Sequence, residues 1–208
     1  MTTEADPTIL SDEELLHRMR GGDEEAFLTL YRRRQKAIYR FAWRMSGSGS
    51  VAEDVTQETF MILLRGNGKY DSARGSFSAY LFGIARNQVL RRLEKDRGML
   101  PLEPARDDAA SRAQDRLVAA EDPLRDLTRR ETIESVRQAV LALPMHYREA
   151  VVLCDLHEMS YLEAAAILNC AVGTVRSRLH RGRGMLVERL RGTETQPQGG
   201  ADSVTCFI

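Results

Sequence analysis

The 208-residue sequence is poor in aromatic residues, cysteine and proline, and its formal net charge is zero. Phenylalanine, tyrosine and tryptophan together make up 6% of the residues, and β-branched residues seldom alternate with polar ones. Strands are rich in aromatic and β-branched residues at alternating positions, so this scarcity favours an all-α protein. A hydrophobic content of 43% excludes a chain that is disordered throughout.

Three cysteines, Cys154, Cys170 and Cys206, form no CxxC pair and no Cys/His set at zinc spacing. We therefore expect no metal site and no cofactor, and a reducing cytoplasm suits the free thiols. The sequence has no apolar run of the roughly 18 to 20 residues that span a bilayer, and the acidic N-terminus lacks the basic start of a signal peptide. The expected location is cytoplasmic, without membrane insertion.

A zero net charge means that any affinity for nucleic acid comes from local patches. One such patch follows a helix-turn-helix pattern. Ser160 and Glu163 form a capping-box pattern, which predicts a short helix that ends near Asn169 and leads through a turn into a second helix. Between Gly173 and Arg191 there are six arginines and one acid, the charge balance of a major-groove helix.

The second helix has two distinct faces, because residues three and four apart lie together on a helix. An apolar or small stripe that can pack consists of Val175, Leu179, Gly182, Leu186 and Leu190. The polar and basic face consists of Arg176, Ser177, His180, Arg181 and Gly184. A solvated surface is the alternative interpretation of the basic face, and the preceding helix and turn favour DNA recognition.

The N-terminal part predicts four helices, over about 11–20, 23–45, 51–64 and 76–95, with a flexible turn at 46–50. On the third helix, an outward stripe combines Asp54, Gln57, Glu58, Met61 and Arg65, which by spacing alone fits an ordinary surface. On the fourth, which Ser76 caps, Tyr80, Asn87 and Arg91 share a face beside a glycine-rich basic loop at 66–75. Stacking, base-edge hydrogen bonds and phosphate contacts of this kind suit single-stranded DNA, and an ordinary amphipathic helix is the alternative.

These segments resemble RNA polymerase sigma factors of the sigma-70 family, in the extracytoplasmic function group. The helix-turn-helix, with GTVRSRLHR at 173–181, resembles region 4. AEDVTQETF at 52–60 resembles region 2.2, and FSAYLFGIARN at 77–87 resembles regions 2.3 and 2.4. Two departures are Tyr80, where the family often has tryptophan, and Cys154, where related chains often have a basic residue.

The resemblance implies three sets of binding residues and no catalytic or metal-binding residue. Core RNA polymerase, through its large catalytic subunits, would contact Asp54, Gln57, Glu58 and Met61. The promoter −10 element would contact Lys69, Arg74, Ser76, Phe77, Tyr80, Asn87 and Arg91. The −35 element would contact Thr174, Arg176, Ser177, His180 and Arg181. An anti-sigma factor is the further expected partner, and no small-molecule substrate is expected.

The expected organisation is two small helical domains on a tether. Residues 1–10 would be a disordered leader, 11–95 region 2, 96–130 a linker with a helical turn near 111–120, 131–191 region 4 and 192–208 a disordered tail. The chain would be an alternative sigma factor, not an enzyme, serving a stress- or signal-responsive regulon. Two alternatives are a stand-alone helix-turn-helix regulator with an N-terminal sensing or dimerisation domain, and an enzyme with an appended DNA-binding domain.

Overall fold

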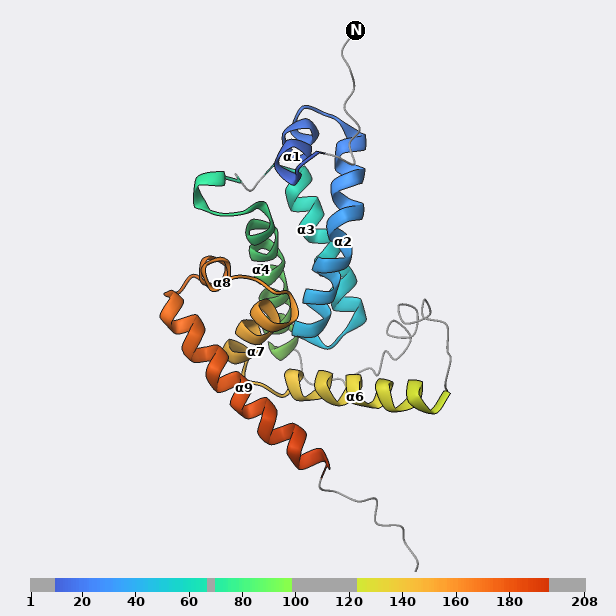
Figure 1. Cartoon of the computed structure of the whole chain (residues 1–208). Coiled ribbons are helices and arrows are strands. Elements are labelled where there is room, and N and C mark those ends of the chain that lie inside the picture. Colours follow the sequence, from blue (N-terminus) through green and yellow to red (C-terminus); the bar gives the residue numbers. More distant parts are fainter. Residues whose placement is uncertain (1–9, 67–69, 99–122, 195–208) are drawn as a thin grey trace, which may run out of the picture.

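The computed structural model describes residues 10–66, 70–98 and 123–194, and every regular element within them is a helix (Figure 1). The all-α prediction is therefore confirmed. The leader at 1–9, Lys69, the segment 99–122 and the tail from 195 lie outside the described residues. Within the described ranges, no helix is both long and apolar enough to cross a membrane.

Four helices form the N-terminal bundle: α1 (Asp12–Arg20), α2 (Glu24–Ser46), α3 (Gly49–Leu64) and α4 (Phe77–Gly98). The capping box predicted at α1 is present, since the Ser11 hydroxyl accepts from the Glu14 amide at 3.2 Å and the Glu14 carboxylate accepts from the Ser11 amide at 2.8 Å. Buried Leu30, Phe41 and Leu81 lie in the core of this bundle. A short 3-10 helix, η1 (Ser72–Arg74), precedes α4.

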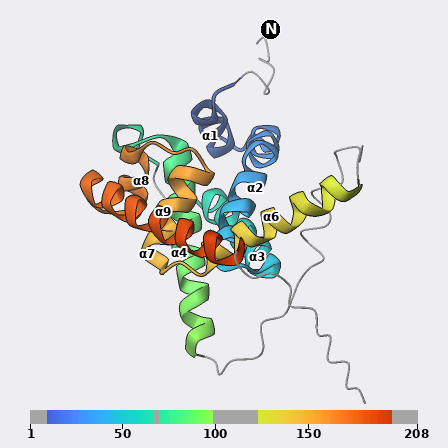
Figure 2. The same cartoon turned by 60° about the horizontal axis from the view of Figure 1, so that its bottom comes forward.

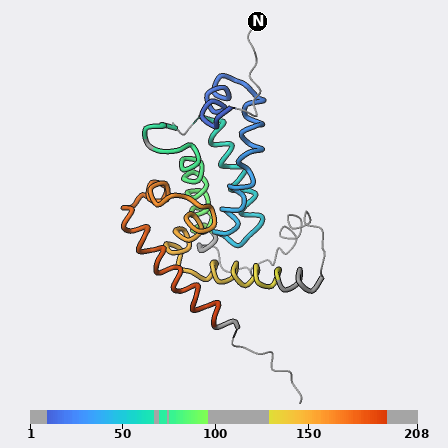
Figure 3. Tube along the Cα trace, viewed as in Figure 1, coloured from blue at the N-terminus to red at the C-terminus, as the bar shows by residue number. Residues whose placement is uncertain are grey.

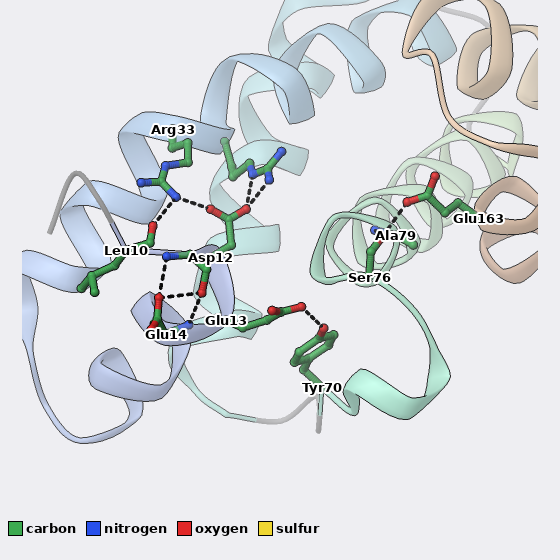
Figure 4. Close-up of polar contacts among 11 residues, drawn as sticks. Leu10, Asp12, Glu13, Glu14, Arg33, Tyr70, Ser76, Ala79 and Glu163 are labelled. Carbon is green, nitrogen blue, oxygen red and sulfur yellow. Dashed lines mark hydrogen bonds and ion pairs between the residues drawn. The ribbon is translucent and has the colours of Figure 1, made fainter.

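Arginines on α2 also fasten α1. The Asp12 carboxylate accepts hydrogen bonds from Arg33 at 2.7 Å and from Arg34 at 2.5 Å, and Arg33 donates in addition to the Leu10 carbonyl at 3.0 Å (Figure 4). Two of the basic residues that the sequence leaves on a solvated face are therefore ion-paired within the bundle.

The turn between α2 and α3 differs from the expected flexible segment. Gly47 ends α2 in the left-handed conformation, at φ 76°, and Ser48 begins α3 at once by accepting from the Val51 amide at 3.4 Å. Gly49 and Ser50 belong to the helix. A glycine C-cap followed directly by a serine N-cap makes a tight connection, so the prediction of a flexible turn was wrong.

The C-terminal group contains α6 (Pro123–Leu141), α7 (Met145–Val151), a π-helix η3 (Val152–Leu156), α8 (Tyr161–Leu168) and α9 (Val172–Glu194). Proline suits the first position of a helix, where its missing N–H costs nothing, and α6 begins at Pro123. Because α4 reaches Gly98, both helices extend into the range 96–130 that the sequence predicts as linker.

The two groups lie against each other. Figures 1 and 3 show α7 and α8 beside α4, with α6 running across the end of the N-terminal bundle, and the turned view in Figure 2 keeps α7 and α8 next to α4. Buried apolar residues of both groups form one connected cluster, from Leu15 in α1 to Leu179 in α9.

Candidate nucleic-acid interfaces

The helix-turn-helix forms as its local sequence predicts. The Ser160 hydroxyl accepts from the Glu163 amide at 3.2 Å, and the Glu163 carboxylate accepts from the Ser160 amide at 3.1 Å, so both halves of the capping box are present. Asn169 ends α8 in the left-handed conformation, at φ 50°. Asparagine tolerates that conformation better than most residues, and it turns the chain into α9.

The packed face of α9 is the predicted stripe. Val175 is fully buried and Leu179 is 2% exposed. Gly182 allows close approach to α7, because a Cβ there would lie 2.9 Å from a methyl carbon of Val151. A small residue is therefore required at this crossing, and the crossing fixes which face of α9 points outward.

The opposite face of α9 is open to solvent. Arg176, Ser177, His180 and Arg181 are all exposed, and Thr174 is half-buried. The Arg176 guanidinium lies 5.6 Å from the centre of the Tyr161 ring, a cation–π contact that holds it at the start of α9. The structure thus brings all five residues predicted to read the −35 element to the first three turns of one helix.

The segment before α8 braces α9. Arg183 donates two hydrogen bonds to the Asp155 carboxylate, at 3.0 and 2.5 Å, and so ties η3 to α9. Cys154, in the same π-helix, is half-buried, and burial raises the pKa of its thiol. The predicted departure at Cys154 therefore places a neutral thiol where related chains often carry a cation. Cys170, in the turn, packs against the core.

The outward stripe on α3 is accessible, but two of its acids have partners. Asp54 and Gln57 are exposed, whereas Glu58 and Met61 are half-buried. Arg92 of α4 pairs with Asp54 at 2.8 Å, and Arg65 lies 3.7 Å from Glu58. These are surface pairs, each worth at most about 1 kcal/mol, so a protein partner can replace them at little cost.

An aromatic cluster lies at the start of α4. The rings of Tyr70, Phe77 and Tyr80 lie 5.5 to 6.2 Å apart between centres. Phe77 is 2% exposed and Tyr80 is half-buried. Burial raises the pKa of Tyr80, and within the described part of the chain its hydroxyl has no hydrogen-bond partner.

Tyr70 is a member of this cluster that the sequence did not single out. Its hydroxyl donates to the Glu13 carboxylate at 2.8 Å (Figure 4), and burial together with this hydrogen bond raises the pKa of Tyr70 to about 12. The signal available in the sequence was an aromatic residue directly after the glycine-rich loop, seven residues before Phe77.

The remaining residues predicted for the −10 element divide between the surface of α4 and its N-terminus. Asn87 and Arg91 are exposed on α4. Ser76 caps the helix by accepting from the Ala79 amide at 3.2 Å, and its hydroxyl donates to the Glu163 carboxylate of α8 at 2.8 Å (Figure 4). The side chain of Arg74, like the whole of Lys69, lies outside the described residues.

Two family models match the chain. Residues 30–98 match Sigma-70 region 2, and residues 133–186 match Sigma-70 region 4. The first match covers most of α2 together with α3 and α4, and the second runs from α6 into α9.

Similar proteins carry both regions in the same order. The ECF RNA polymerase sigma factor SigE of Mycolicibacterium smegmatis is 38% identical over 174 residues, which cover 81% of this chain and 64% of SigE. SigW of Bacillus subtilis is 32% identical over 178 residues, which cover 85% of this chain and 95% of SigW.

Two solved structures share the fold. CnrH in complex with the cytosolic domain of CnrY has a TM-score of 0.64 and 26% identity, and the match covers 87% of this chain and 97% of CnrH. The sigma factor RpoE in complex with the anti-sigma factor NepR, from Bartonella quintana, has a TM-score of 0.56 and 26% identity, with 76% of this chain and 91% of RpoE covered.

Proposed function

The chain belongs to the sigma-70 family of RNA polymerase sigma factors, in its extracytoplasmic function group, and we propose that its two helical domains bind one promoter at two separate elements while both are mounted on core polymerase. It is an alternative sigma factor that directs transcription initiation. The observation that supports the two-element mode best is the open arginine face of α9 in the same chain as the aromatic cluster of α4.

We assign recognition of the −35 element to the N-terminal half of α9. Arg176 and Arg181 supply donors for guanine edges and phosphates, while Thr174, Ser177 and His180 supply shorter polar contacts on the same face. A good bidentate contact is worth about 1 to 3 kcal/mol of discrimination between bases. The thiol at Cys154 adds no cationic phosphate contact beside this helix.

We assign the opened −10 strand to the start of α4 and the loop before it. An extruded base needs a stacking partner to offset an unstacking cost of a few kcal/mol, and Tyr80 is the half-buried aromatic residue of the cluster. Phe77 is buried behind it, so its role is to hold the Tyr80 ring in place. Ser76, Asn87 and Arg91, with Lys69 and Arg74 of the loop, supply the polar and phosphate contacts.

We assign the contact with core polymerase to α3, through Asp54, Gln57, Glu58 and Met61. The polymerase performs the chemistry in the cytoplasm, and this chain recognises and opens DNA without a catalytic role of its own. The matching structures of CnrH and RpoE are complexes with CnrY and the anti-sigma factor NepR, and an anti-sigma factor is accordingly a partner of this chain. A stand-alone regulator is not favoured, because the N-terminal half matches Sigma-70 region 2.

Reconstituted transcription on a library of random promoters tests the proposal. Core polymerase alone and core polymerase with the chain are compared, and the start sites are mapped by sequencing the transcripts. We expect new start sites that share two sequence elements upstream, at −10 and −35. Start sites that do not change when the chain is added would contradict the proposal.

A further inference from the structure

We propose that the free chain holds itself closed, with region 4 (α6 to α9) docked on region 2 (α1 to α4) so that the helix assigned to the −10 strand is covered. This inference rests on the proposed role of α4. It concerns the state of the chain before core polymerase binds, and it is drawn from four kinds of contact between the two regions.

The first contact is a buried ion pair. Arg86 of α4 donates to the Glu149 carboxylate of α7 at 2.7 Å, and the two side chains are 19% and 4% exposed. A charge withdrawn from water this far is unfavourable unless it is paired and hydrogen-bonded. The carboxylate of region 4 therefore depends on a cation of region 2, which makes the docking specific.

The second kind of contact satisfies the ends of helices across the boundary. Arg148 of α7 donates to the Met45 carbonyl, in the last turn of α2, at 2.6 Å. In return, Arg44 of α2 donates to the carbonyl of Leu156, the last residue of η3, at 2.8 Å. The last carbonyls of a helix have no partner within it, so each region completes a helix end of the other.

The third kind of contact is close packing. The His157 ring of region 4 lies 5.0 Å from the ring of Phe82 and 5.9 Å from that of Phe41, both in region 2. Leu141 of α6 packs onto Gly47, where a Cβ would lie only 2.9 Å from a methyl carbon of the leucine. The glycine that ends α2 thus also admits a side chain of region 4.

The fourth contact covers the −10 site itself. Ser76, the N-cap of α4, donates to the Glu163 carboxylate of α8 at 2.8 Å (Figure 4). Hydrogen bonds from Ser76 and Ser160 lower the pKa of Glu163. A carboxylate anion thus occupies the hydroxyl that is assigned to the DNA strand, and it repels an approaching phosphate. The arginine face of α9 remains exposed.

The spacing of the promoter elements gives the closed arrangement its consequence. Elements at −35 and −10 lie about 25 base pairs apart, or about 85 Å of duplex at 3.4 Å per pair. In the closed chain, Arg176 rests on Tyr161, and Glu163, two residues further along α8, contacts Ser76. The two DNA-binding faces are therefore far too close together to hold both elements, and core polymerase has to separate the regions.

Distance measurement by electron–electron spin resonance tests the closed state without disturbing the interface. Spin labels are attached at Glu24→Cys on α2 and Glu188→Cys on α9, both exposed positions, with Cys154, Cys170 and Cys206 replaced by alanine. We expect one narrow distance distribution in the free chain and a shift to longer distances when core polymerase is added. A broad distribution in the free chain, or the same distance with and without polymerase, would overturn the proposal.

A charge-removal variant links closure to access. Glu149→Gln leaves Arg86 without its anion only in the closed state, and it changes a residue of region 4 that is not assigned to DNA. We expect free Glu149→Gln to bind a single-stranded oligonucleotide carrying a −10 sequence about tenfold more tightly than the unmodified chain, since apparent affinity follows the fraction in the competent state. The exchange Arg86→Glu with Glu149→Arg should restore the weaker binding.

The matched control is Arg32→Gln, which breaks the exposed pair between Arg32 and Glu25 within α2, where the side chains are 67% and 60% exposed. It should change neither the distance distribution nor oligonucleotide binding. Equal binding by Glu149→Gln and the unmodified chain would count against the covering of α4. If the free chain is closed but directs no transcription with core polymerase, the proposed function fails and the closed state stands; the opposite pair of results removes only the closed state.

Discussion

The Glu149 carboxylate of α7 and the Arg86 guanidinium of α4 meet at 2.7 Å, although 62 residues separate them in the sequence. Each residue belongs to a different family region. The pair therefore joins the domain assigned to the −35 element to the helix assigned to the −10 element. Contacts of this kind make the arrangement of the two domains part of the protein's chemistry, and the predictions below separate that arrangement from the binding faces themselves.

Arg176→Ala should weaken use of the −35 element by about 5- to 150-fold, which corresponds to the 1 to 3 kcal/mol of one good base contact. Binding to core polymerase should not change. The measurement is transcription from promoters with an intact or scrambled −35 element. Arg189→Ala is the control: it removes the same charge 13 residues further along α9, where helical geometry places it on another face. Equal losses with both promoters would show that Arg176 does not read that element.

Asp54→Lys combined with Glu58→Lys should abolish most binding to core polymerase while leaving the fold intact. The change places cations beside Arg92 and Arg65, but these are exposed pairs, so the free energy of unfolding should fall by no more than about 1 kcal/mol for each. Fluorescence anisotropy with core polymerase measures binding, and thermal unfolding measures stability. Glu25→Lys on α2 is the control, and a similar loss of binding in this variant would contradict the assignment to α3.

Tyr80→Phe should retain opening of the −10 element, whereas Tyr80→Ala should lose about 1 to 3 kcal/mol of binding to the single strand, the value of one stacked base. Because the buried hydroxyl has no partner in the described structure, its removal should leave the thermal stability unchanged or slightly raised. Permanganate footprinting of the opened strand, with polymerase present, reports the effect. Loss of opening in Tyr80→Phe would point to a hydrogen bond rather than stacking.

Local sequence was sufficient to predict the elements that local chemistry determines. The serine and glutamate three residues apart at the starts of α1 and α8 specify capping boxes, and both are formed. The apolar stripe of α9 likewise specifies its packed face. The connection at Gly47 and Ser48 was misread, because a glycine and serine run is typical of a flexible turn unless each residue is recognised as the cap of a helix.

Contacts between distant residues could not be predicted in the same way. Glu163 completes a capping box, and nothing in that pattern indicates its second hydrogen bond, to Ser76, which lies 87 residues earlier. Arg92, which pairs with Asp54, and Tyr70, which joins the aromatic cluster, gave no periodic signal. The roles assigned to the three binding faces stay predictions until they are tested on the protein with its partners.

The closed state should weaken in mild acid because of His157. Burial, followed by the charges of Arg44 and Arg40, lowers the pKa of His157 to about 3, from an ordinary value of 6.5. Glu158 and Glu163 line the same cleft and oppose this effect. With a pKa that is lower in the closed state, the stabilisation is complete above pH 6.5 and declines by about 1.4 kcal/mol per pH unit as the pH falls toward 3.

The distance distribution between Glu24→Cys and Glu188→Cys measures this effect. Between pH 7.5 and 5.5 the open fraction should rise by about tenfold. His157→Phe should remove the pH dependence, because a phenyl ring keeps the contacts with Phe41 and Phe82 and cannot be protonated. His146→Gln, at an exposed position, should retain it. A pH response that persists in His157→Phe would assign the titration to another group.

Protection of promoter DNA by the chain, with and without core polymerase, tests the central claim most directly. Footprints are recorded with the chain alone, with core polymerase alone and with both, on a promoter taken from the transcription library. The account predicts protection of the −35 and −10 elements together only when both proteins are present. Equal occupancy of the two elements by the chain alone, at the same concentration, would contradict it.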